Sequence, residues 1–302
     1  MKIINKLKTN KQMNSLFHKV VIRRLAEINP TIATKVLYNF SQGKRLNLSN
    51  ARTLNEKLQY LKLKTYYNNP TITQCVDKYR VREYLIERGY ARLLNDLEGD
   101  GFYKSPNDID FDVLPNRFVL KCNHDSGSII VCTDKNGMDR AQVVCKLNQS
   151  LNNEYWKDNV EIQYKYVKKG IVCEKYLEDE EKGLVDYKFY CYNGIPKLLY
   201  CTLPHKKDEK LQMNFYDLNW NKLPIHRKDT VNIKNPVKKP EKLNEMIEIA
   251  SELSAPFPFV RIDLFCVNNK IYFGEFTFVP TAGLAKYEEP NADEKLGEML
   301  II

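Results

Sequence analysis

Two carboxylates near the C-terminus stand where an apolar alternation would place hydrophobic residues. Asp263 and Glu275 each lie in a short alternating segment, residues 259–266 and 271–278, of the kind that forms a β-strand. Neighbouring carboxylates repel each other, so such a pair indicates either a bound cation or an adjacent arginine. Carboxylate oxygens suit a Mg2+ ion that is carried in with a nucleotide phosphate.

The register of this hairpin decides whether the two acids meet. If the loop is residues 268–270, Asp263 lies opposite Glu275 and Arg261 lies opposite Thr277, all on one face of the sheet. A loop of two residues would place the acids on opposite faces. An ion network of Arg261 with the two acids, without a metal, fits the same spacing, so both interpretations are open.

A lysine at the end of a predicted strand offers a second site, for an anion. Lys121 closes the apolar segment 118–121, and the polar loop that follows contains Ser126, Gly127 and Ser128. The backbone N–H groups of such a loop and the ammonium group can surround a phosphate. The glycine spacing and the Gly-Lys-Ser/Thr ending of a Walker A loop are absent. Strand–turn–strand elements with Ser-Gly are common, so the loop also fits a purely structural turn.

A third candidate lies where the apolar segment 171–176 enters a polar stretch. Glu174, Lys175, Tyr176 and Leu177 could present backbone donors and acceptors to the edge of a nucleotide base in an apolar slot. In isolation, the same residues are typical of an ordinary strand end.

These candidates must be positioned by a mixture of helices and strands. The pattern predicts a helical arm over residues 1–50 and helices over residues 53–89, separated at Asn69-Pro70. Beyond residue 95 it predicts antiparallel hairpins rather than regular βαβ units, and hence an α+β protein. The predicted strands are 118–121, 129–133, 171–176, 187–192, 197–202, 259–266 and 271–278, and the predicted helices are 142–151 and 241–253.

Composition excludes several classes of protein. The 302 residues are 43% hydrophobic and 28% charged, which is ordinary for a globular protein. No apolar run reaches the roughly 18–20 residues of a membrane-spanning helix and no signal-peptide pattern opens the chain, so we expect a cytoplasmic protein. The eight cysteines form no Cys-x-x-Cys pair and the four histidines show no zinc-ligand spacing, so free thiols are expected and a zinc site is not. The net charge of +9 favours an anionic partner.

Residues 1–24 combine basic and apolar residues at helical spacing. Such a segment could contact an acidic membrane surface, which would make the protein peripheral on the inner face of the membrane. The alternative is a helix that packs on the body of the protein and exposes a basic face to water.

Taken together, in this order, the three candidate elements resemble the ATP-grasp superfamily. The resemblance implies an ATP-grasp fold, with two α+β lobes sandwiching ATP and an N-terminal helical extension, and it implies ATP and Mg2+ as cofactors. The implied divisions are a basic helical arm (1–50), an N-terminal helical lobe (51–115), a small subdomain with the phosphate loop (116–172) and a C-terminal subdomain with the metal site (173–302).

The resemblance also implies a role for each nucleotide-binding residue. Lys121, with its Ser126-Gly127-Ser128 loop, resembles the lysine and flexible loop that close over the phosphates. Residues 174–177 resemble the hinge that grips adenine, and Lys78 belongs to an Asp-Lys pair like the one that begins the ATP-grasp core. Asp186 falls where the family has its ribose-binding acid.

The catalytic and metal residues follow from the same resemblance. Arg261 and Asp263, with Glu275 and Thr277, resemble the Arg-x-Asp and Glu-x-Asn pair of the D-alanine ligase group. In that group the acids hold Mg2+ and the arginine stabilises the charge that is transferred. Lys188 lies at a position that often faces phosphate or substrate. Thr277 departs from the usual asparagine, and the expected Pro-Gly is replaced by residues 280–283.

A more specific similarity is to the teichuronopeptide-type (TupA-like) ATP-grasp proteins, over roughly residues 40–302. The segments that carry it are Asn55-Glu56-Lys57-Leu58-Gln59, Asp77-Lys78-Tyr79-Arg80-Val81-Arg82, Lys121-Cys122-Asn123-His124, Asp186-Tyr187-Lys188-Phe189 and Phe273-Gly274-Glu275-Phe276-Thr277-Phe278. This resemblance implies an ATP-dependent carboxylate–amine ligase. The carboxylate would belong to an acidic glycan, such as a uronic acid of a capsule or other surface polysaccharide, and the amine to an amino acid or peptide.

Two other functions compete with this one. A glycosyltransferase would use a metal–nucleotide-sugar motif of the Asp-x-Asp kind, which Asp108, Asp110 and Asp112 match twice. The acidic stretch bounded by prolines favours a solvated turn instead. A nucleic-acid-binding module could use the 19 tyrosines for stacking, but no recognition motif accompanies them, so no nucleic acid partner is expected.

Overall fold

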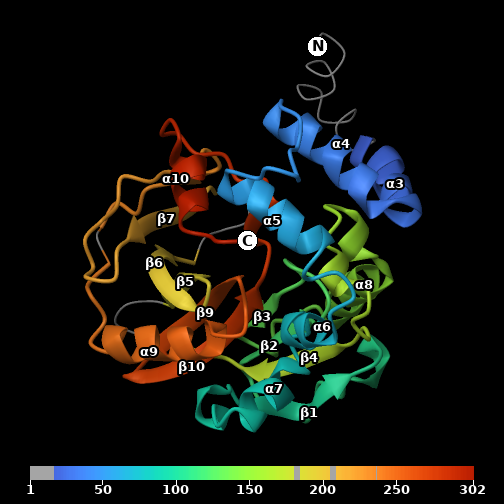
Figure 1. The fold of residues 1–302 in the computed structure, drawn as a ribbon. Coiled ribbons are helices and arrows are strands. Elements are labelled where there is room, and N and C mark those ends of the chain that lie inside the picture. The colour runs from blue at the N-terminus through green and yellow to red at the C-terminus, as the bar shows by residue number, and fades with distance from the viewer. Residues whose placement is uncertain (1–16, 180–183, 205–208, 236) are drawn as a thin grey trace.

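Two β-sheets form the framework of the protein (Figure 1). The computed structural model describes residues 17–179, 184–204, 209–235 and 237–302 of the chain. Within these residues the chain has the predicted α+β character, with antiparallel hairpins in both sheets. None of the described helices has the length and apolar character needed to cross a membrane.

The larger sheet has six strands and is antiparallel except for its last pair. Its strands, in spatial order, are β10 (Lys270–Thr277), β9 (Phe259–Val267), β5 (Asp186–Tyr192), β6 (Ile195–Thr202), β7 (Leu211–Tyr216) and β8 (Thr230–Val231). One face is apolar: Phe276, Ile262, Phe189 and Leu199 pair across neighbouring strands and belong to the main core. Helix α9 (Leu243–Ser254) contacts three of these strands and buries Met246, Ile249 and Leu253 in the same core. Because side chains alternate along a strand, the other face is left for polar residues.

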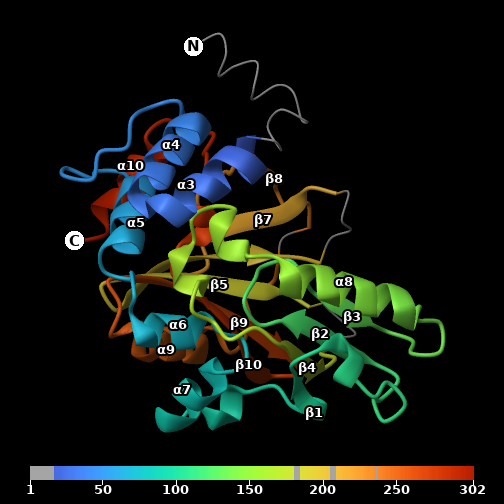
Figure 2. The same ribbon diagram turned by 90° about the vertical axis from the view of Figure 1, so that its right-hand side faces the viewer.

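The smaller sheet has four strands, in the order β1 (Leu97–Tyr103), β4 (Ile171–Lys175), β2 (Phe118–Cys122) and β3 (Ile130–Cys132). Phe118, Leu120 and Cys173 form a separate core with Leu147 of α8 (Arg140–Asn152). Figure 2 shows α8 beside this sheet. Strand β4 runs across the predicted boundary at 172/173, and β1 falls in the predicted helical lobe. Strand pairing places both segments in the smaller sheet.

Helix α5 (Leu54–Leu63) connects distant parts of the chain. Thr53 and Glu56 form a capping box at its start. Asn55 Nδ2 donates to Ala285 O, Gln59 Nε2 donates to Ala282 O and Gly283 O, and Lys57 Nζ donates to Gly297 O. The helix therefore holds the segment 282–297, which follows the last strand. The other helices of this part are α6 (Pro70–Val76), α7 (Val81–Glu87) and α10 (Ala292–Glu298), and the short turns are η2 (Ala91–Leu93), η3 (Pro106–Asp108), η4 (Tyr155–Lys157), η5 (Ile162–Tyr164) and η6 (Pro280–Gly283).

The described part of the N-terminal arm is helical, as expected. It consists of η1 (Phe17–Ile22), α3 (Arg23–Ile28) and α4 (Pro30–Gln42). Asn29 caps α4, and Gly43 ends it in the left-handed conformation. Ile22, Ala26, Ala33 and Leu37 pack against Trp156 and Ile162 of the body. Residues 1–16, which carry much of the predicted membrane contact, lie outside the described residues.

Candidate functional site

A single row of paired residues crosses four neighbouring strands on the polar face of the larger sheet. Glu275 on β10 pairs with Asp263 on β9, Asp263 pairs with Lys188 on β5, and Lys188 pairs with Tyr200 on β6. The next row places Thr277 opposite Arg261. The sheet therefore brings together two acids, a lysine and an arginine that the sequence analysis selected from three separate segments.

These side chains are directly bonded to one another. Arg261 donates from Nε to Asp263 Oδ1 and from Nη2 to Asp263 Oδ2, each at 2.6 Å, and from Nη2 to Glu275 Oε1 at 2.8 Å. Lys188 Nζ donates to Asp263 Oδ2 at 2.5 Å and also forms an ion pair with Asp186. Asp263 is 1% exposed, whereas the Glu275 side chain is 38% exposed. The acids are therefore neutralised by protein cations, and the ion network of the sequence analysis is present.

The predicted pairing of the acids is confirmed, but the predicted loop is wrong. Val267 pairs with Lys270, so the loop is only Asn268 and Asn269, both with positive φ as in a tight hairpin turn. The register then shifts between Phe273 and Glu275, where Gly274 is an extra residue. This bulge reverses the facing of the residues that follow, which is why a two-residue loop still places Glu275 opposite Asp263. A side chain at residue 274 would approach Asp263 O and the Phe265 ring to 3.0 Å, which explains the glycine.

Burial and neighbouring charges act in opposite directions on the two acids. Burial raises the pKa of Asp263 to about 6, against the opposing effects of Arg261 and Lys188. Burial also acts to raise the pKa of Glu275, but Arg261, Lys188 and Lys78 outweigh it and lower that pKa to about 2. Both carboxylates are therefore largely ionised at neutral pH, and both can act as oxygen ligands.

The arrangement fits a divalent cation with phosphate bound to it. The buried Oδ1 of Asp186 has no hydrogen-bond partner among the described residues. Glu275 uses Oε1 for Arg261 and for the Thr277 hydroxyl, which donates at 3.1 Å. Asp263, in contrast, already accepts three bonds, so a cation at Asp263 would compete with Arg261 and Lys188. Carboxylate oxygens that face cationic side chains suit Mg2+ accompanied by phosphate.

Lys121 lies on one face of the smaller sheet, and the core formed by Phe118 and Leu120 lies on the other face. Its Nζ donates to Glu174 Oε2 at 2.7 Å, and both side chains are largely buried. Two residues that were predicted to bind ATP through different groups therefore bind each other in this structure. A phosphate at Lys121 would have to share or replace Glu174.

The loop after β2 is held by Lys78 and its neighbours. Lys78 donates from its backbone N–H to Asn123 O at 3.2 Å and from Nζ to Asp125 O. Asn123 donates to the Asp77 carboxylate and to Lys168 O, so the start of the loop is fixed. The charge of Lys78 also lowers the pKa of Glu275, so Lys78 acts electrostatically on the row of paired residues.

Among the predicted phosphate-loop residues, Ser128 is bonded within the loop itself. Its hydroxyl accepts from Cys122 N at 3.1 Å and donates to Asp125. Ser126 and Gly127 are exposed, and Gly127 has a φ of 103° that disfavours other residues. Ser126 and Gly127 are therefore accessible to a ligand.

The predicted adenine hinge continues from the end of β4. Asn95 Nδ2 donates to Lys175 O at 2.8 Å, and Lys175 N donates to Asp96 O. Arg117 lies over the Tyr176 ring at 4.3 Å. Leu177 is half-buried and lies four residues beyond the core residue Cys173. Asn95 thus positions the hinge. No motif surrounds Asn95 in the sequence, so this role could not be predicted.

Two more residues of this region were missed from the sequence. Tyr200 accepts a bond from Arg261 Nη1 at 3.0 Å, but a tyrosine in an apolar strand is indistinguishable from a core residue. Arg227 is buried, donates to Asp229 at 3.0 Å and acts electrostatically on Tyr190 and Tyr200. Its sequence context, between His226 and Lys228, is typical of a surface loop.

The Asp-x-Asp residues form local turns away from this site. Asp108 accepts from Ser105 N, Asp110 accepts from Asp112 N, and Asp112 pairs with Arg140 on α8. All three side chains are exposed. They fit the solvated turn that the sequence favoured over a metal–sugar site.

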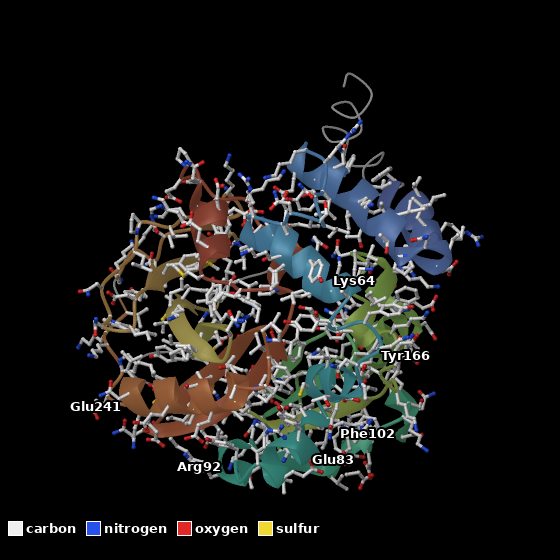
Figure 3. The ribbon with its side chains drawn as sticks, viewed as in Figure 1. Lys64, Glu83, Arg92, Phe102, Tyr166 and Glu241 are labelled. Carbon is white, nitrogen blue, oxygen red and sulfur yellow. The ribbon has the colours of Figure 1, made fainter. Side chains whose placement is uncertain are left out.

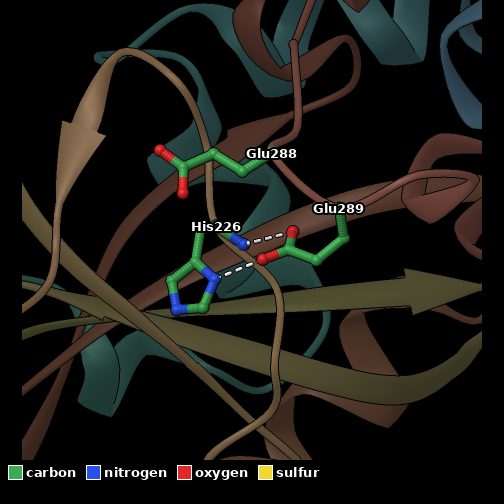
Figure 4. A group of neighbouring side chains, drawn as sticks. All are labelled: His226, Glu288 and Glu289. Atoms are coloured by element: carbon green, nitrogen blue, oxygen red, sulfur yellow. Dashed lines mark hydrogen bonds and ion pairs between the residues drawn. The ribbon is translucent and has the colours of Figure 1, made fainter.

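A second group of metal-ligand types was not visible in the sequence. His226, Glu288 and Glu289 have ligand atoms within 4.8 Å of one another (Figure 4). The two oxygens of Glu289 accept from the backbone and the ring of His226, and Glu288 N donates to His226 O. These bonds already explain the cluster as a link between two chain segments.

No curated protein matches the chain. Among solved structures, the D-alanine–D-alanine ligase from Bacillus anthracis complexed with ATP is 14% identical, with a TM-score of 0.39, and the match covers 68% of this chain and 54% of that one. The Helicobacter pylori D-alanine–D-alanine ligase is 14% identical, with a TM-score of 0.40 and coverages of 82% and 69%. The ATP-grasp ligase PsnB complexed with a minimal precursor is 9% identical, with a TM-score of 0.37 and coverages of 70% and 54%.

The chain thus spans little more than half the length of the Bacillus anthracis ligase and of PsnB. The model of one protein family, described as TupA-like ATPgrasp, matches residues 56–301. This match covers both sheets and every site residue described above. The chain therefore belongs to the TupA-like ATP-grasp family, and its two-sheet α+β architecture is an ATP-grasp fold.

Proposed function

We propose that the protein is an ATP-dependent ligase that activates a substrate carboxylate for attack by an amine. The observation that carries this proposal is the row Glu275–Asp263–Lys188, with Arg261 bonded to both acids. Such a set offers oxygen ligands for a metal and cations for phosphate oxygens within one hydrogen-bonded group. Phosphoryl transfer needs this combination more than it needs a protein nucleophile.

In the proposed reaction, a substrate carboxylate oxygen attacks the γ-phosphorus of ATP and the bond to the ADP oxygen breaks. Glu275, Asp263 and Thr277 would hold Mg2+, which would neutralise part of the negative charge of the phosphate oxygens. Arg261 and Lys188 offset the negative charge that develops during transfer. The amine nitrogen then attacks the carbonyl carbon of the acyl phosphate, inorganic phosphate leaves, and the nitrogen loses a proton.

The nucleotide would lie against both sheets. Lys121, Lys78 and the loop 126–128 would contact the phosphates, Asp186 would contact the ribose, and residues 174–177 would contact the adenine. The buried, unpartnered Oδ1 of Asp186 supports its role, because a hydroxyl donor would satisfy it.

For the substrates we propose a uronic acid of a surface polysaccharide and the amine of an amino acid or peptide, in the cytoplasm. This assignment follows the teichuronopeptide-type resemblance. It makes the enzyme one that modifies an acidic glycan rather than one that extends it. A nucleotide-sugar-dependent glycosyltransferase is less well supported, because its Asp-x-Asp residues form exposed turns.

Ligand-induced stabilisation separates these two classes. Mg-ATP should raise the melting temperature, and Mn-UDP-glucose should not, because a ligand at 100 times its Kd stabilises the native state by about 2.7 kcal/mol. Lys121→Ala should abolish most of the Mg-ATP effect. Lys104→Ala is the matched control, because Lys104 is exposed and lies outside the site. A shift with Mn-UDP-glucose alone would refute the ligase proposal.

The reaction type has its own test. With ATP, Mg2+, glucuronate and hydroxylamine, the enzyme should form ADP and a glucuronyl hydroxamate in equal amounts, because hydroxylamine traps an acyl phosphate. ADP formation that occurs without any hydroxamate, across a panel of uronic acids and amino acids, would contradict carboxylate activation.

A further inference from the structure

The net positive charge of this protein comes from one end of the sequence. Residues 1–46 contain ten Lys or Arg and a single acid, Glu27. The remaining 256 residues contain 37 Lys or Arg and 37 Asp or Glu, so they carry no net charge. The whole net charge of +9 therefore belongs to the N-terminal segment and not to the nucleotide site. Such segregation indicates that this end of the chain has an anionic partner of its own.

The described part of that segment has two sides of different character. Its inner side packs on the body of the protein through Ile22, Ala26 and Leu37. Its outer side exposes large aliphatic residues, including Ile28 at 79% and Ile32 at 50%. Val20 and Val21 are exposed on the preceding turn. Figures 1 and 2 show α3 and α4 side by side at one corner of the molecule.

Cations and a cavity border this apolar surface. A largely apolar cavity of about 490 Å3 lies between η1 and α4 and is lined by Phe17, Val36, Phe40 and Leu46 together with the polar residues Lys35, Asn39 and Arg45. Ile32 and Val36 are one turn apart on α4, so the cavity and the exposed aliphatic residues share a side of that helix. Lys35 and Arg45 form no ion pair with any residue in the described ranges. Glu27, the one acid, is already bound by Lys157.

We propose that this outer surface, formed by η1, α3 and α4, rests on an anionic lipid bilayer. Exposed aliphatic side chains next to unpaired cations match the boundary between acyl chains and negatively charged headgroups. A nucleic acid or a soluble acidic glycan would use the cations but would leave Ile28 and Ile32 in water. A second copy of the chain would bring two strongly positive surfaces together. The contact extends through α4 to residue 46, beyond the segment 1–24 that the sequence suggested.

This inference does not depend on the ligase activity, and it can be tested without ATP. Co-sedimentation of the full-length protein with vesicles of equimolar phosphatidylglycerol and phosphatidylcholine should show strong binding, and vesicles of phosphatidylcholine alone should show little. The double variant Lys35→Ala/Arg45→Ala should bind about 25-fold more weakly, because each basic residue near an anionic surface contributes roughly a factor of five. The matched control is Lys104→Ala/Lys197→Ala, which removes the same charge from exposed positions elsewhere.

A second pair of variants separates a bilayer from other anions. Ile28→Ser/Ile32→Ser should weaken vesicle binding by at least about tenfold, because each buried isoleucine contributes roughly 1.5–3 kcal/mol, and should not affect retention on heparin. The hydroxamate assay on soluble glucuronate should stay unchanged for these variants. Equal vesicle binding by wild type and Ile28→Ser/Ile32→Ser would overturn the proposal. So would concentration-dependent dimerisation that the same variant abolishes.

Discussion

Two groups of buried charged residues in this protein differ in how their charges are paired. In the row on the larger sheet, every buried charge is bonded directly to an opposite one, from Glu275 through Arg261 and Asp263 to Lys188 and Asp186. Between α5 and η5, in contrast, Lys62 is 1% exposed and Glu161 is 6% exposed, and they form no ion pair within 4 Å. Lys62 Nζ reaches only Asn159 O, at 3.4 Å. Lys64, which directly follows the last residue of α5, is exposed, and it is labelled in Figure 3.

The contrast shows how direct bonds decide the state of a buried charge. Burial lowers the pKa of Lys62 to about 7 and raises that of Glu161 to about 7, because the hydrogen bond between Tyr155 and Glu161 and the mutual attraction of the two charges offset only part of the desolvation. In the row, neighbouring cations hold the pKa of Glu275 at about 2. In the same row the pKa of the more deeply buried Asp263 rises only to about 6, so the row stays largely charged at pH 7 and is suited to binding phosphate and metal. Lys62 and Glu161 can each become neutral at that pH.

The largest expected effect comes from breaking the row at its centre. Asp263→Asn would leave Arg261 and Lys188 buried without their main counter-charge, so the free energy of unfolding should fall by about 3–5 kcal/mol. The rate of ATP-dependent transfer should fall by about 10²- to 10³-fold or more. A melting curve without metal and a turnover assay with Mg2+ measure the two effects. The sequence alone suggested that neutralising one acid would relieve repulsion; the ion pairs reverse that expectation for Asp263.

Glu275→Gln is the matched comparison for this variant. Turnover should fall by a similar factor, but the free energy of unfolding should change by only about 1 kcal/mol, because the Glu275 side chain is partly exposed. If Asp263→Asn and Glu275→Gln destabilise the metal-free protein equally, the row does not act as described.

Removing the charges of Lys62 and Glu161 should stabilise the protein, whereas Asp263→Asn should destabilise it. The double variant Lys62→Met/Glu161→Gln should raise the free energy of unfolding by about 1–4 kcal/mol, because it replaces poorly paired buried charges. Turnover should stay within a few-fold of wild type. Chemical denaturation at several pH values measures the effect.

The pH dependence of that gain follows from the two pKa shifts. Glu161 titrates higher in the folded state, so its contribution to wild-type stability falls as pH rises from about 4 to 7. Lys62 titrates lower, so its contribution falls as pH decreases from about 10 to 7. The advantage of the double variant should therefore be largest near pH 7. An advantage that stays constant from about pH 5 to 9 would contradict this account.

A smaller effect is expected from the bulge that sets the register of the row. Gly274→Ala should lower the free energy of unfolding by about 1–3 kcal/mol, because the new methyl group meets Asp263 O and the Phe265 ring at 3.0 Å. Relief of this close contact would displace Asp263 and Glu275 relative to each other. Mg2+-dependent turnover should therefore fall by up to about 10²-fold. Gly137→Ala is the control, because its nearest neighbour is a side-chain oxygen of Asp134 in an exposed loop. An unaffected Mg2+ requirement in Gly274→Ala would argue against the role of the bulge.

The smallest effect concerns the end of the row. Tyr200→Phe removes one bond to Arg261, so stability should fall by about 1–2 kcal/mol and turnover by less than about tenfold. The KM for ATP should stay near its wild-type value, because Tyr200 orients Arg261 and is assigned no nucleotide contact. A large rise in that KM would instead give Tyr200 a direct role in binding.

The sequence predicted most strands of the two sheets because their apolar alternation is local. It missed β1, in which Gly99 and Gly101 have positive φ and interrupt the alternation, and it also missed β7 and β8 at one edge of the larger sheet. It predicted which acids would meet but not how, because the bulge at Gly274 and the two-residue turn change the register by compensating amounts. The ion pairs of Lys188 and Lys121 join segments that are far apart in the sequence, so no local pattern could reveal them.

The bonds between α5 and the segment 282–297 also have a consequence for the order of synthesis. Asn55, Lys57 and Gln59 donate to carbonyls that lie 223–240 positions later in the chain. A ribosome that adds roughly 5–20 residues per second produces those acceptors about 10–50 s after it has produced α5. During that interval Asn55, Lys57 and Gln59 lack these acceptors, which follow even β9 and β10 in the chain. The bonds that join α5 to the segment 282–297 can therefore form only after all the strands of the larger sheet have been made.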